Sequence, residues 1–375
     1  HPTQCLPVML DVGTNNEDML DDPLYLGLER RRERGPAYDE LVEEFMTAVQ
    51  EKFPRALVQL EDFGNSNAFR LLAEYRDRLC LFDDDIQGTG AVALAGLLAA
   101  LRISGGELAK QRVLIFGAGQ AGIGIGNTIV AAMIDQGIPA AEAQGCCWFF
   151  DSQGLLTAGR SALPSQKQPY AHEHAPMEDF AEAVSSLRPT VLIGCAGQPG
   201  VFTEEVVQLM AEQNERPVIF ALSNPTSKAE CTAVQAYGWT DGRAIFASGS
   251  PFEPVQMGNS TFVPGQGNNA YIFPGVGLGA VVSGTRRVTD EMFLAAAKVL
   301  ADQVTDEDLA LGRIYPGLSR IREVSALIAA EVAALAWRRG LAGREAPADI
   351  LAAVREQRFQ PLYPHYARLT SPRRR

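Results

Sequence analysis

The sequence of 375 residues predicts an α/β fold with a doubly wound parallel sheet and a helical C-terminal part. Three observations support this fold class. From residue 88 onward, short and continuously apolar runs alternate with helical patterns, which is typical of a parallel sheet covered on both faces. One of these runs ends in a glycine-rich turn that opens a helix. After a span rich in Pro and Gly over residues 251–279, a single apolar face at helical spacing runs toward the end of the chain.

The composition excludes several classes of protein. With 46% hydrophobic and 21% charged residues, the chain is neither disordered nor fibrous, and its length predicts two or three domains. Its 33 Lys and Arg against 45 Asp and Glu give a net charge of −12, which argues against nucleic acid and anionic membranes as partners. The longest apolar run, residues 91–101, is shorter than the ~20 residues that span a bilayer.

The six cysteines show no CxxC spacing, and their density is too low for a disulfide scaffold. We therefore expect reduced, partly buried thiols and a cytoplasmic location, with the mitochondrial matrix left open. No signal peptide is visible and the chain opens on His1 instead of Met, so we expect a fragment or a processed product.

The elements follow in order along the chain. Residues 6–16 (LPVMLDVGTNN) form an apolar run that ends in turn residues and predicts a strand. Residues 38–52 predict a helix whose buried face carries Leu41, Phe45 and Val49. Two short apolar runs, 56–60 and 79–82, each end in acidic residues, and residues 67–76 between them predict a helix.

The doubly wound region follows. Strands are predicted at 113–116, 146–150, 191–193, 218–222 and 244–247. Helices are predicted at 91–101, 121–136, 181–187, 204–213 and 229–237, with a loop at 137–144. A final long helix is predicted from its apolar face, which carries Ile321, Val324, Ile328, Val332 and Leu335.

The segment VLIFGAGQAGIG carries the sharpest local signal. Gly117, Gly119 and Gly122 follow an apolar strand and open a helix, so they allow a tight turn and the close approach of a pyrophosphate to the helix N-terminus. This pattern predicts a Rossmann-type dinucleotide site. Asp151 ends the next strand and is the candidate acceptor for the adenosine ribose hydroxyls, although an ordinary helix N-cap is the alternative.

Four acidic residues, Glu61, Asp62, Asp84 and Asp85, follow the two short strands of the N-terminal region. Convergent carboxylates repel one another, and ligands made only of oxygen suit Mg²⁺ or Mn²⁺. Acidic residues at strand ends are also common caps, so spacing alone leaves a metal site open. A zinc site is not expected, because no His pair has ligand spacing and His172 and His174 are predicted to be loop residues.

Two segments beyond the predicted sheet place amides in Gly- and Pro-rich turns. LSNPT contains Asn224, and GQGNN contains Asn268 and Asn269. Their side chains could donate hydrogen bonds to a carboxylate, and turn formation by Asn is the alternative.

Together, seven segments resemble the malic enzymes in order and spacing over nearly the whole chain. They are LPVMLDVGTNN, QLEDFGNSNAF, DDDIQGTGAVALAG, FGAGQAGIGI, ALSNPT, ASGSPF and PGQGNNAYIFPG. The resemblance implies oxidative decarboxylation of (S)-malate to pyruvate and CO₂, with reduction of NAD or NADP and with Mg²⁺ or Mn²⁺. It also implies malate as a small-molecule partner and a homo-oligomer, either a dimer or a tetramer.

The resemblance also implies the roles of individual residues. The metal ligands are Glu61, Asp62 and Asp85, and the catalytic carboxylates are Asp84 and Asp85. The substrate amides are Asn224, Asn268 and Asn269. The residues that contact the cofactor are Asp85, Thr89, Gly117, Ala118, Gly119, Gln120, Gly122, Asp151 and Asn224.

The family fold implies three parts of the chain. Residues 84–269 form the dinucleotide-binding domain, inserted against a second α/β domain made of residues 1–83 and 270–344. Residues 345–375 form a C-terminal extension.

One departure from the family pattern limits the expected activity. The family's tyrosine acid, lysine base and substrate-binding arginine lie upstream of LPV, so we expect this fragment alone to be inactive. The alternatives are a non-catalytic module that binds NAD and malate, and malolactic conversion of malate to lactate. Because of Asp151 we expect NAD over NADP, while Arg160 and Lys167 leave NADP possible.

Overall fold

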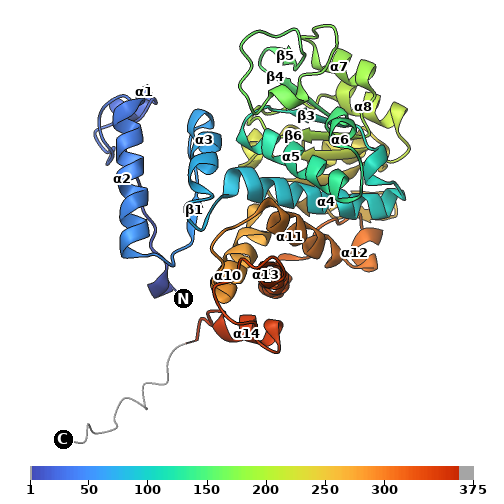
Figure 1. Ribbon diagram of the computed structural model, residues 1–375. Coiled ribbons are helices and arrows are strands. Elements are labelled where there is room, and N and C mark those ends of the chain that lie inside the picture. The colour runs from blue at the N-terminus through green and yellow to red at the C-terminus, as the bar shows by residue number, and fades with distance from the viewer. Residues whose placement is uncertain (1, 363–375) are drawn as a thin grey trace, which may run out of the picture. The chain divides into compact units, whose positions relative to one another are not determined.

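The computed structural model describes residues 2–362, and this part of the chain divides into two compact units. One unit comprises residues 2–56 and 355–362, and the other is Leu57–Val354 (Figure 1). They do not test the predicted division into 1–83 with 270–344, 84–269 and 345–375, which stays a prediction.

The first unit contains η1 (Pro2–Gln4), α1 (Glu17–Leu20) and α2 (Pro36–Lys52). Helix α2 is confirmed, but its predicted buried face is wrong. Tyr38, Val42 and Met46 are buried, whereas Leu41 is 38% exposed. The buried stripe therefore lies one position further along the helix than the sequence pattern indicated.

The predicted strand at 6–16 is also wrong, since no strand forms there. The carboxylate of Asp11 accepts hydrogen bonds from the backbone N–H groups of Gly13 and Leu28, at 2.9 and 2.8 Å. Gly13 has a φ of 89°, so the chain turns at this point. A side-chain acceptor thus binds backbone groups that a β-ladder would otherwise use.

The second unit begins with two short parallel strands, β1 (Val58–Leu60) and β2 (Leu81–Asp83), joined by helix α3 (Asn65–Tyr75). In their register, Leu60 lies opposite Asp83. The residues that follow the two strands therefore emerge side by side.

The main sheet has seven strands in the order β11-β8-β7-β6-β3-β4-β5. Its strands are β3 (Val113–Phe116), β4 (Cys147–Asp151), β5 (Gly154–Leu155), β6 (Val191–Gly194), β7 (Val218–Ala221), β8 (Ile245–Ser248) and β11 (Gly265–Gln266). All neighbouring pairs are parallel except β4 and β5. The predicted doubly wound parallel sheet is confirmed.

Alternate residues of β3 enter separate cores on the two faces of the sheet. Val113 and Ile115 join the core with α4 (Thr89–Ser104), α5 (Gln120–Asp135) and α11 (Asp290–Asp302). Leu114 and Phe116 join the core of the opposite face. The helices of that second core are α7 (Phe180–Leu187), α8 (Glu204–Gln213) and α9 (Ala233–Gly238).

Helix α4 packs between α5 and α11 inside the second unit (Figure 1). Together with the preceding turn it forms a helical stretch of 21 residues, Asp84–Ser104, which is apolar and long enough to cross a membrane. Because 78% of its most apolar window is buried inside the structure, we interpret it as a core helix.

The C-terminal part is helical, as predicted. It contains α10 (Phe273–Ser283), α12 (Asp306–Ala310), α13 (Ile321–Arg338) and α14 (Ile350–Gln357), in addition to α11. Helix α13 buries Val324, Ile328, Val332 and Leu335, which confirms the predicted face. A side chain at Gly275 of α10 would meet Cβ of Ile328 at 2.6 Å, so the two helices approach closely.

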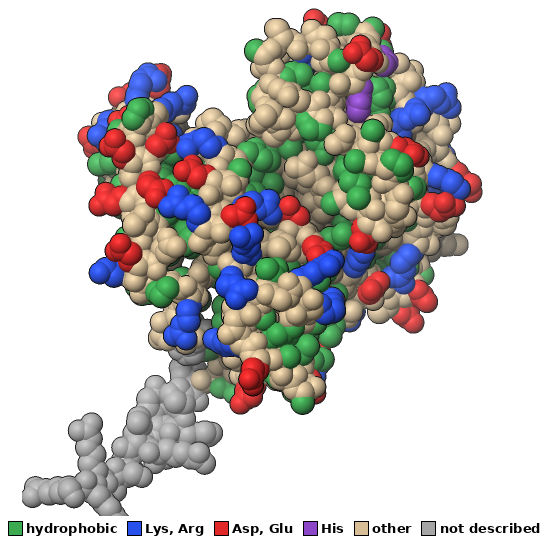
Figure 2. All heavy atoms as spheres, viewed as in Figure 1, with side chains coloured by type: hydrophobic (Ala, Val, Ile, Leu, Met, Phe, Trp, Pro, Cys, Tyr) green, Lys and Arg blue, Asp and Glu red, His purple; other side chains and the backbone are tan. Residues whose placement is uncertain are grey.

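Several short elements lie outside the sequence prediction. Helix α6 (Ala140–Gly145) forms where a loop was predicted, and the antiparallel strands β9 (Val255–Met257) and β10 (Ser260–Phe262) lie in the span rich in Pro and Gly. The remaining short helices are η3 (Leu108–Lys110), η4 (Gln168–Tyr170), η5 (Thr226–Lys228), η6 (Asn269–Tyr271) and η7 (Leu318–Arg320). On the face seen in Figure 2, acidic and basic side chains are intermixed.

Candidate active site

The loops at the carboxyl edge of the main sheet surround the point where the strand order reverses. Strand β3 lies between β4 and β6, so the chain continues to one side through β4 and to the other through β6. In open α/β sheets, ligands bind in the crevice at such a switch point. The glycine-rich turn follows β3 at this position.

The backbone of this turn requires glycine at two positions. Gly117 has a φ of 121°, in the region that side chains rarely adopt, and a Cβ on Gly122 would lie 1.9 Å from the carbonyl oxygen of Gly117. Helix α5 begins directly after the turn, at Gln120. The predicted arrangement of strand, tight turn and helix N-terminus is confirmed.

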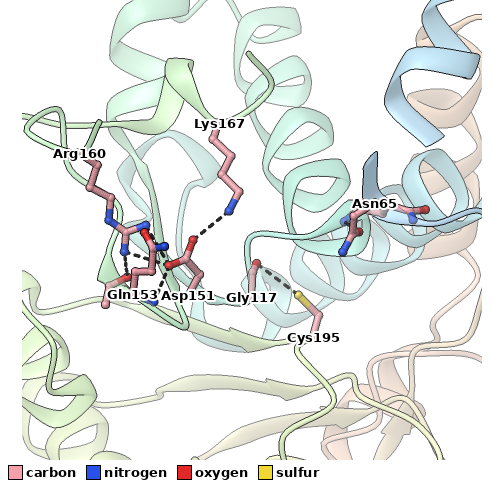
Figure 3. A network of polar contacts seen from close by, with 9 residues as sticks. Asn65, Gly117, Asp151, Gln153, Arg160, Lys167 and Cys195 are labelled. Atoms are coloured by element: carbon pink, nitrogen blue, oxygen red, sulfur yellow. Dashed lines mark hydrogen bonds and ion pairs between the residues drawn. The ribbon is translucent and has the colours of Figure 1, made fainter. Parts of the chain in front are cut away.

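Asn65, which sequence reasoning missed, lies against this turn (Figure 3). Its Oδ1 accepts a hydrogen bond from the backbone N–H of Gln120 at 2.9 Å, and the side chain of Gln120 donates to the carbonyl of Phe63. The segment Glu61–Asn65 is thereby bonded to the first turn of α5. The only sequence signal was an Asn in EDFGN, three residues after the acidic pair.

The acidic residues predicted as metal ligands come together after β1 and β2. The backbone N–H of Asp62 donates to Oδ2 of Asp85 at 2.8 Å, and Asp62 itself has a φ of 60°. The side chain of Gln59 donates to Oε2 of Glu61 at 2.8 Å. The pairing of the two strands therefore places the two acidic segments in contact.

A π-helical turn, η2 (Asp84–Gly88), connects β2 to α4 and carries Asp84 and Asp85. Asp83 caps it by accepting a hydrogen bond from the backbone N–H of Ile86 at 3.0 Å. Gln87 accepts from the N–H of Asp83 and donates to Asp290 at 2.7 Å. Single π-helical turns of this kind frequently occur at functional sites.

Burial and mutual repulsion raise the pKa values of these carboxyl groups. Burial raises the pKa of Glu61, and the nearby charges of Asp85 and Asp62 raise it further. Burial also raises the pKa of Asp85. For Asp83 and Asp84, burial is again the largest cause, and it raises the pKa of each to about 7.

Two buried carboxylate oxygens of this cluster, Oδ2 of Asp83 and Oδ1 of Asp84, have no hydrogen-bond partner. Among residues 2–362, however, no group of three or more His, Cys, Asp and Glu side chains is arranged to hold a metal ion. The ligand set of Glu61, Asp62 and Asp85 therefore stays a prediction.

The predicted substrate amides have different surroundings. The Nδ2 of Asn269 donates to Oδ2 of Asp84 and to Oγ1 of Thr89, both at 3.1 Å, so it holds the acidic turn. The Oδ1 of Asn268 caps η6 by accepting from the N–H of Ala270. Asn224 is exposed in the loop after β7. Their predicted contact with malate stays a prediction.

Asp151 lies at the end of β4 beside the glycine turn, as predicted, but its carboxylate is already engaged (Figure 3). Arg160 donates to Oδ1 and Lys167 to Oδ2, each at 2.9 Å. Burial alone would raise the pKa of Asp151, but hydrogen bonds from Lys167, the N–H of Gln153 and Arg160 outweigh it and lower the pKa.

Comparison with known families and structures agrees with this geometry. Residues 1–76 match the family model described as malic enzyme, N-terminal domain, and residues 86–337 match malic enzyme, NAD binding domain. The structure is similar to the malic enzyme of Entamoeba histolytica, with a TM-score of 0.67 and 26% identity over 84% of this chain and 61% of that one. The malic enzyme of Pyrococcus horikoshii gives the same TM-score and identity, over 84% and 68% of the two chains.

Sequence relatives are closer. The NADP-dependent malic enzyme of Columba livia is 52% identical over 96% of this chain and 66% of its own length. The mitochondrial NADP-dependent malic enzyme of Homo sapiens is 50% identical over 97% of this chain and 61% of its own length. The chain thus spans between three fifths and two thirds of the length of these relatives. The match of two family models and of these relatives shows that the chain belongs to the malic enzyme family.

Proposed function

We propose that the protein carries the cofactor- and metal-binding part of an enzyme that converts (S)-malate to pyruvate and CO₂ with reduction of NADP⁺. One observation carries the proposal. The acidic segment Glu61–Asn65 is hydrogen-bonded to the dinucleotide turn through Asn65 and Gln120. A substrate held at the carboxylates would therefore lie next to a cofactor held at the turn.

The residues present fit both groups. Gly117 has a φ of 121° and a Cβ on Gly122 would lie 1.9 Å from a carbonyl oxygen, so the turn is built of glycines whose backbone, with the helix N-terminus, can approach a pyrophosphate. At the acidic cluster all the candidate ligand atoms are oxygens, and a divalent cation would relieve the repulsion from Asp85 and Asp62, which adds to burial in raising the pKa of Glu61. When bound, the cation supplies Lewis-acid polarisation of malate, and the nicotinamide supplies a hydride acceptor.

The chain's own carboxylates add proton chemistry. The pKa of Asp84 is raised to about 7, so this group holds or releases a proton near neutral pH. Its Oδ2 accepts a hydrogen bond from Asn269, which fixes the carboxyl group and leaves Oδ1 without a partner. We assign Oδ1 of Asp84 as a proton-exchanging atom beside the substrate, and we assign Asn224 and Asn268 as donors to the substrate carboxylates.

We propose NADP⁺ as the cofactor instead of NAD⁺. The expected preference for NAD⁺ depended on a carboxylate of Asp151 that is available to the ribose hydroxyls. In the structure this carboxylate is neutralised by two cations, so Asp151, Arg160 and Lys167 together carry a charge of +1. A 2′-phosphate is attracted by such a group, and NADP-dependent relatives agree with this choice.

The cofactor proposal is tested by titrating NADP⁺ and NAD⁺ against Lys167→Ala. We expect affinity for NADP⁺ to fall by about tenfold and affinity for NAD⁺ to change little, because only NADP⁺ has the 2′-phosphate that loses a charged partner. Lys110→Ala, which removes an exposed lysine after α4, is the control. Equal losses for both cofactors would contradict the assignment of Lys167.

The metal proposal is tested by calorimetric titration of Mn²⁺. Asp85→Ala is expected to abolish binding, whereas Glu212→Ala, which removes one exposed carboxylate from α8, should leave it unchanged. Mn²⁺ binding that persists in Asp85→Ala would show that the cation is held elsewhere.

The reaction itself is tested on the chain extended at residue 1 by the upstream segment of a full-length malic enzyme, because residues 1–375 alone are expected to lack the acid and the base. Malate-dependent formation of NADPH is followed and the products are identified. Pyruvate and NADPH in equal amounts support the proposal. Lactate without NADPH would indicate malolactic conversion, and cofactor binding without any product would indicate a binding module. The homo-oligomer and the cytoplasmic location stay predictions, since relatives include proteins named as mitochondrial and chloroplastic.

A further inference from the structure

Glu230 is a buried carboxylate at the carboxyl edge of the sheet that the proposed chemistry does not use. Glu230 is 0% exposed, and none of the ion pairs among residues 2–362 involves its carboxylate. A buried charge without a counter-charge is costly, and a hydrophobic side chain of similar size would be easier to accommodate. An acidic residue at this place therefore calls for a specific set of partners.

The partners of Glu230 are hydrogen-bond donors from two loops. Oε1 accepts from the hydroxyl of Ser223, and Oε2 accepts from the backbone N–H of Ser223 at 3.3 Å. The backbone N–H of Ala196 also donates to the carboxylate. Ser223 follows β7 and Ala196 follows β6, so this one side chain joins the loops of two neighbouring strands. Only a carboxylate offers two acceptor oxygens without a donor.

Ser223 extends the network back toward the glycine turn. Its Oγ accepts a hydrogen bond from the N–H of Gly197 at 2.8 Å. In the same loop, the thiol of Cys195 lies 3.7 Å from the carbonyl oxygen of Gly117 (Figure 3). The loops after β3, β6 and β7 are thus connected in series from Gly117 to Glu230.

The backbone at the end of β6 packs closely against the side chain of Glu230. A Cβ on Gly194, at the end of β6, would lie 2.4 Å from Cγ of Glu230, so strand and side chain are in close contact. The carbonyl oxygen of Glu230 accepts from the N–H of Phe202, which ties the chain beyond the β6 loop to the same residue. Glu230 is therefore fixed at its backbone and at both carboxylate oxygens.

We propose that Glu230, through Ser223, is a positioning residue that holds the β6 and β7 loops in the shape needed by the nicotinamide half of the cofactor. This inference rests on the proposed function. Asp151 marks the adenosine half beyond β4, so the nicotinamide half lies on the other side of β3, beside the β6 and β7 loops. Asn224, the proposed donor to substrate, follows Ser223 directly in the chain.

The test compares two ligands in fluorescence titrations of the protein. NADPH spans both halves of the site, whereas adenosine 2′,5′-bisphosphate occupies only the adenosine half. We expect Glu230→Gln and Ser223→Ala each to weaken NADPH binding by about tenfold, the effect of one lost hydrogen bond to a buried group. Binding of adenosine 2′,5′-bisphosphate should change less than about twofold, because its contacts lie beside Asp151.

Control variants remove the same groups from the surface. Ser227→Ala lies in the same loop region as Ser223, and Glu212→Gln lies on α8, and both residues are exposed. These variants should bind both ligands like the parent. If Glu230→Gln does not fold, Ser223→Ala carries the test, because it removes the same hydrogen bond and retains the carboxylate.

The outcomes separate a positioning role from a structural one. Equal weakening of both ligands with a lowered Tm would show that Glu230 only stabilises the fold and would overturn the proposal. Unchanged NADPH binding in both variants would overturn it as well. A parent protein that binds neither ligand would contradict the proposed function itself, and the inference with it.

Discussion

At the scale of single residues, the backbone of Asp62 combines an unusual conformation with a charged side chain. Its φ of 60° lies in the left-handed region, which Asn and Asp tolerate better than other residues that carry a Cβ. The conformation directs its N–H toward Asp85. One residue thus provides both a candidate ligand and the turn that brings a second carboxylate close.

We predict that Asp62→Ala and Asp62→Asn differ in stability but not in metal binding. Both remove the charge, so affinity for Mn²⁺ should fall in each. Ala is poorly suited to the left-handed region, whereas Asn tolerates it. The free energy of unfolding of the Asp62→Ala variant should therefore be lower than that of the Asp62→Asn variant by about 1 kcal/mol. Urea denaturation and calorimetry check this, and equal stabilities would argue against strain at this position.

Asp151 gives a prediction with a defined pH dependence. Its pKa is lowered in the folded state, so its stabilising effect is present above the unfolded pKa of about 3.9 and is lost as the pH falls through the folded value. Asp151→Asn should lower the free energy of unfolding by about 2 kcal/mol at neutral pH. The difference between parent and variant should stay constant from pH 5 to 8 and shrink below about pH 4. Urea denaturation across this range measures it.

Residue types identified part of the site, and contacts identified the rest. The tight turns that glycine permits and the mutual repulsion of clustered carboxylates follow from residue type alone. Gly117 and Asp85 could therefore be predicted from the sequence. The roles of Asn65 and Glu230 depend on which loops the fold brings together, and nothing in their immediate neighbours indicates this. The charge balance at Asp151 likewise depends on a loop that returns Arg160 and Lys167 to it.

At the scale of elements, the strands of the main sheet were predicted well because each is buried on both faces and therefore continuously apolar. β3 and α8 match their predicted ranges. Short elements were missed because they contain too few residues to show a period. The π-helical turn was missed for another reason, since it depends on side-chain hydrogen bonds in which Asp83 and Asp290 accept and Gln87 both donates and accepts.

The first turn of α5 provides a prediction at this scale. Gly122→Ala places a methyl group 1.9 Å from the carbonyl oxygen of Gly117, so the dinucleotide turn must open or the helix must shift. We expect NADPH affinity to fall by at least tenfold, as titration would show. Gly145→Ala, near the end of α6 with open space around the new Cβ, is the matched control and should bind normally. Normal binding in Gly122→Ala would mean that the turn is not part of the cofactor site.

At the scale of the whole molecule, the acidic cluster, the dinucleotide turn and the amide-bearing loops all lie in the unit Leu57–Val354. The resemblance implies a tyrosine acid and a lysine base in addition, and no residue of the 375 matches them. We therefore predict that residues 1–375 alone bind cofactor but oxidise malate negligibly. A positioned acid or base contributes about 10² to 10⁴-fold to a rate.

The measurement follows malate-dependent NADPH formation with Mn²⁺ for residues 1–375 and for a version extended at residue 1 by the upstream segment of a full-length malic enzyme. The extended version should be faster by at least about 10²-fold. Comparable rates from the two proteins would show that a residue within the 375 supplies the base.

The packing of α4 against α11 also matters while the protein is being made. Phe82 of β2, two residues before the helical stretch Asp84–Ser104, has its ring centroid 5.5 Å from that of Phe293 in α11, although more than 200 residues separate them in the chain. At translation rates of roughly 5–20 residues per second, α4 leaves the ribosome roughly 10 to 40 s before α11 can cover it. During that interval an apolar helix is exposed on a nascent chain, which is the situation in which chaperones bind. Ribosomes arrested before Asp290 should therefore retain more chaperone than ribosomes arrested after Asp302.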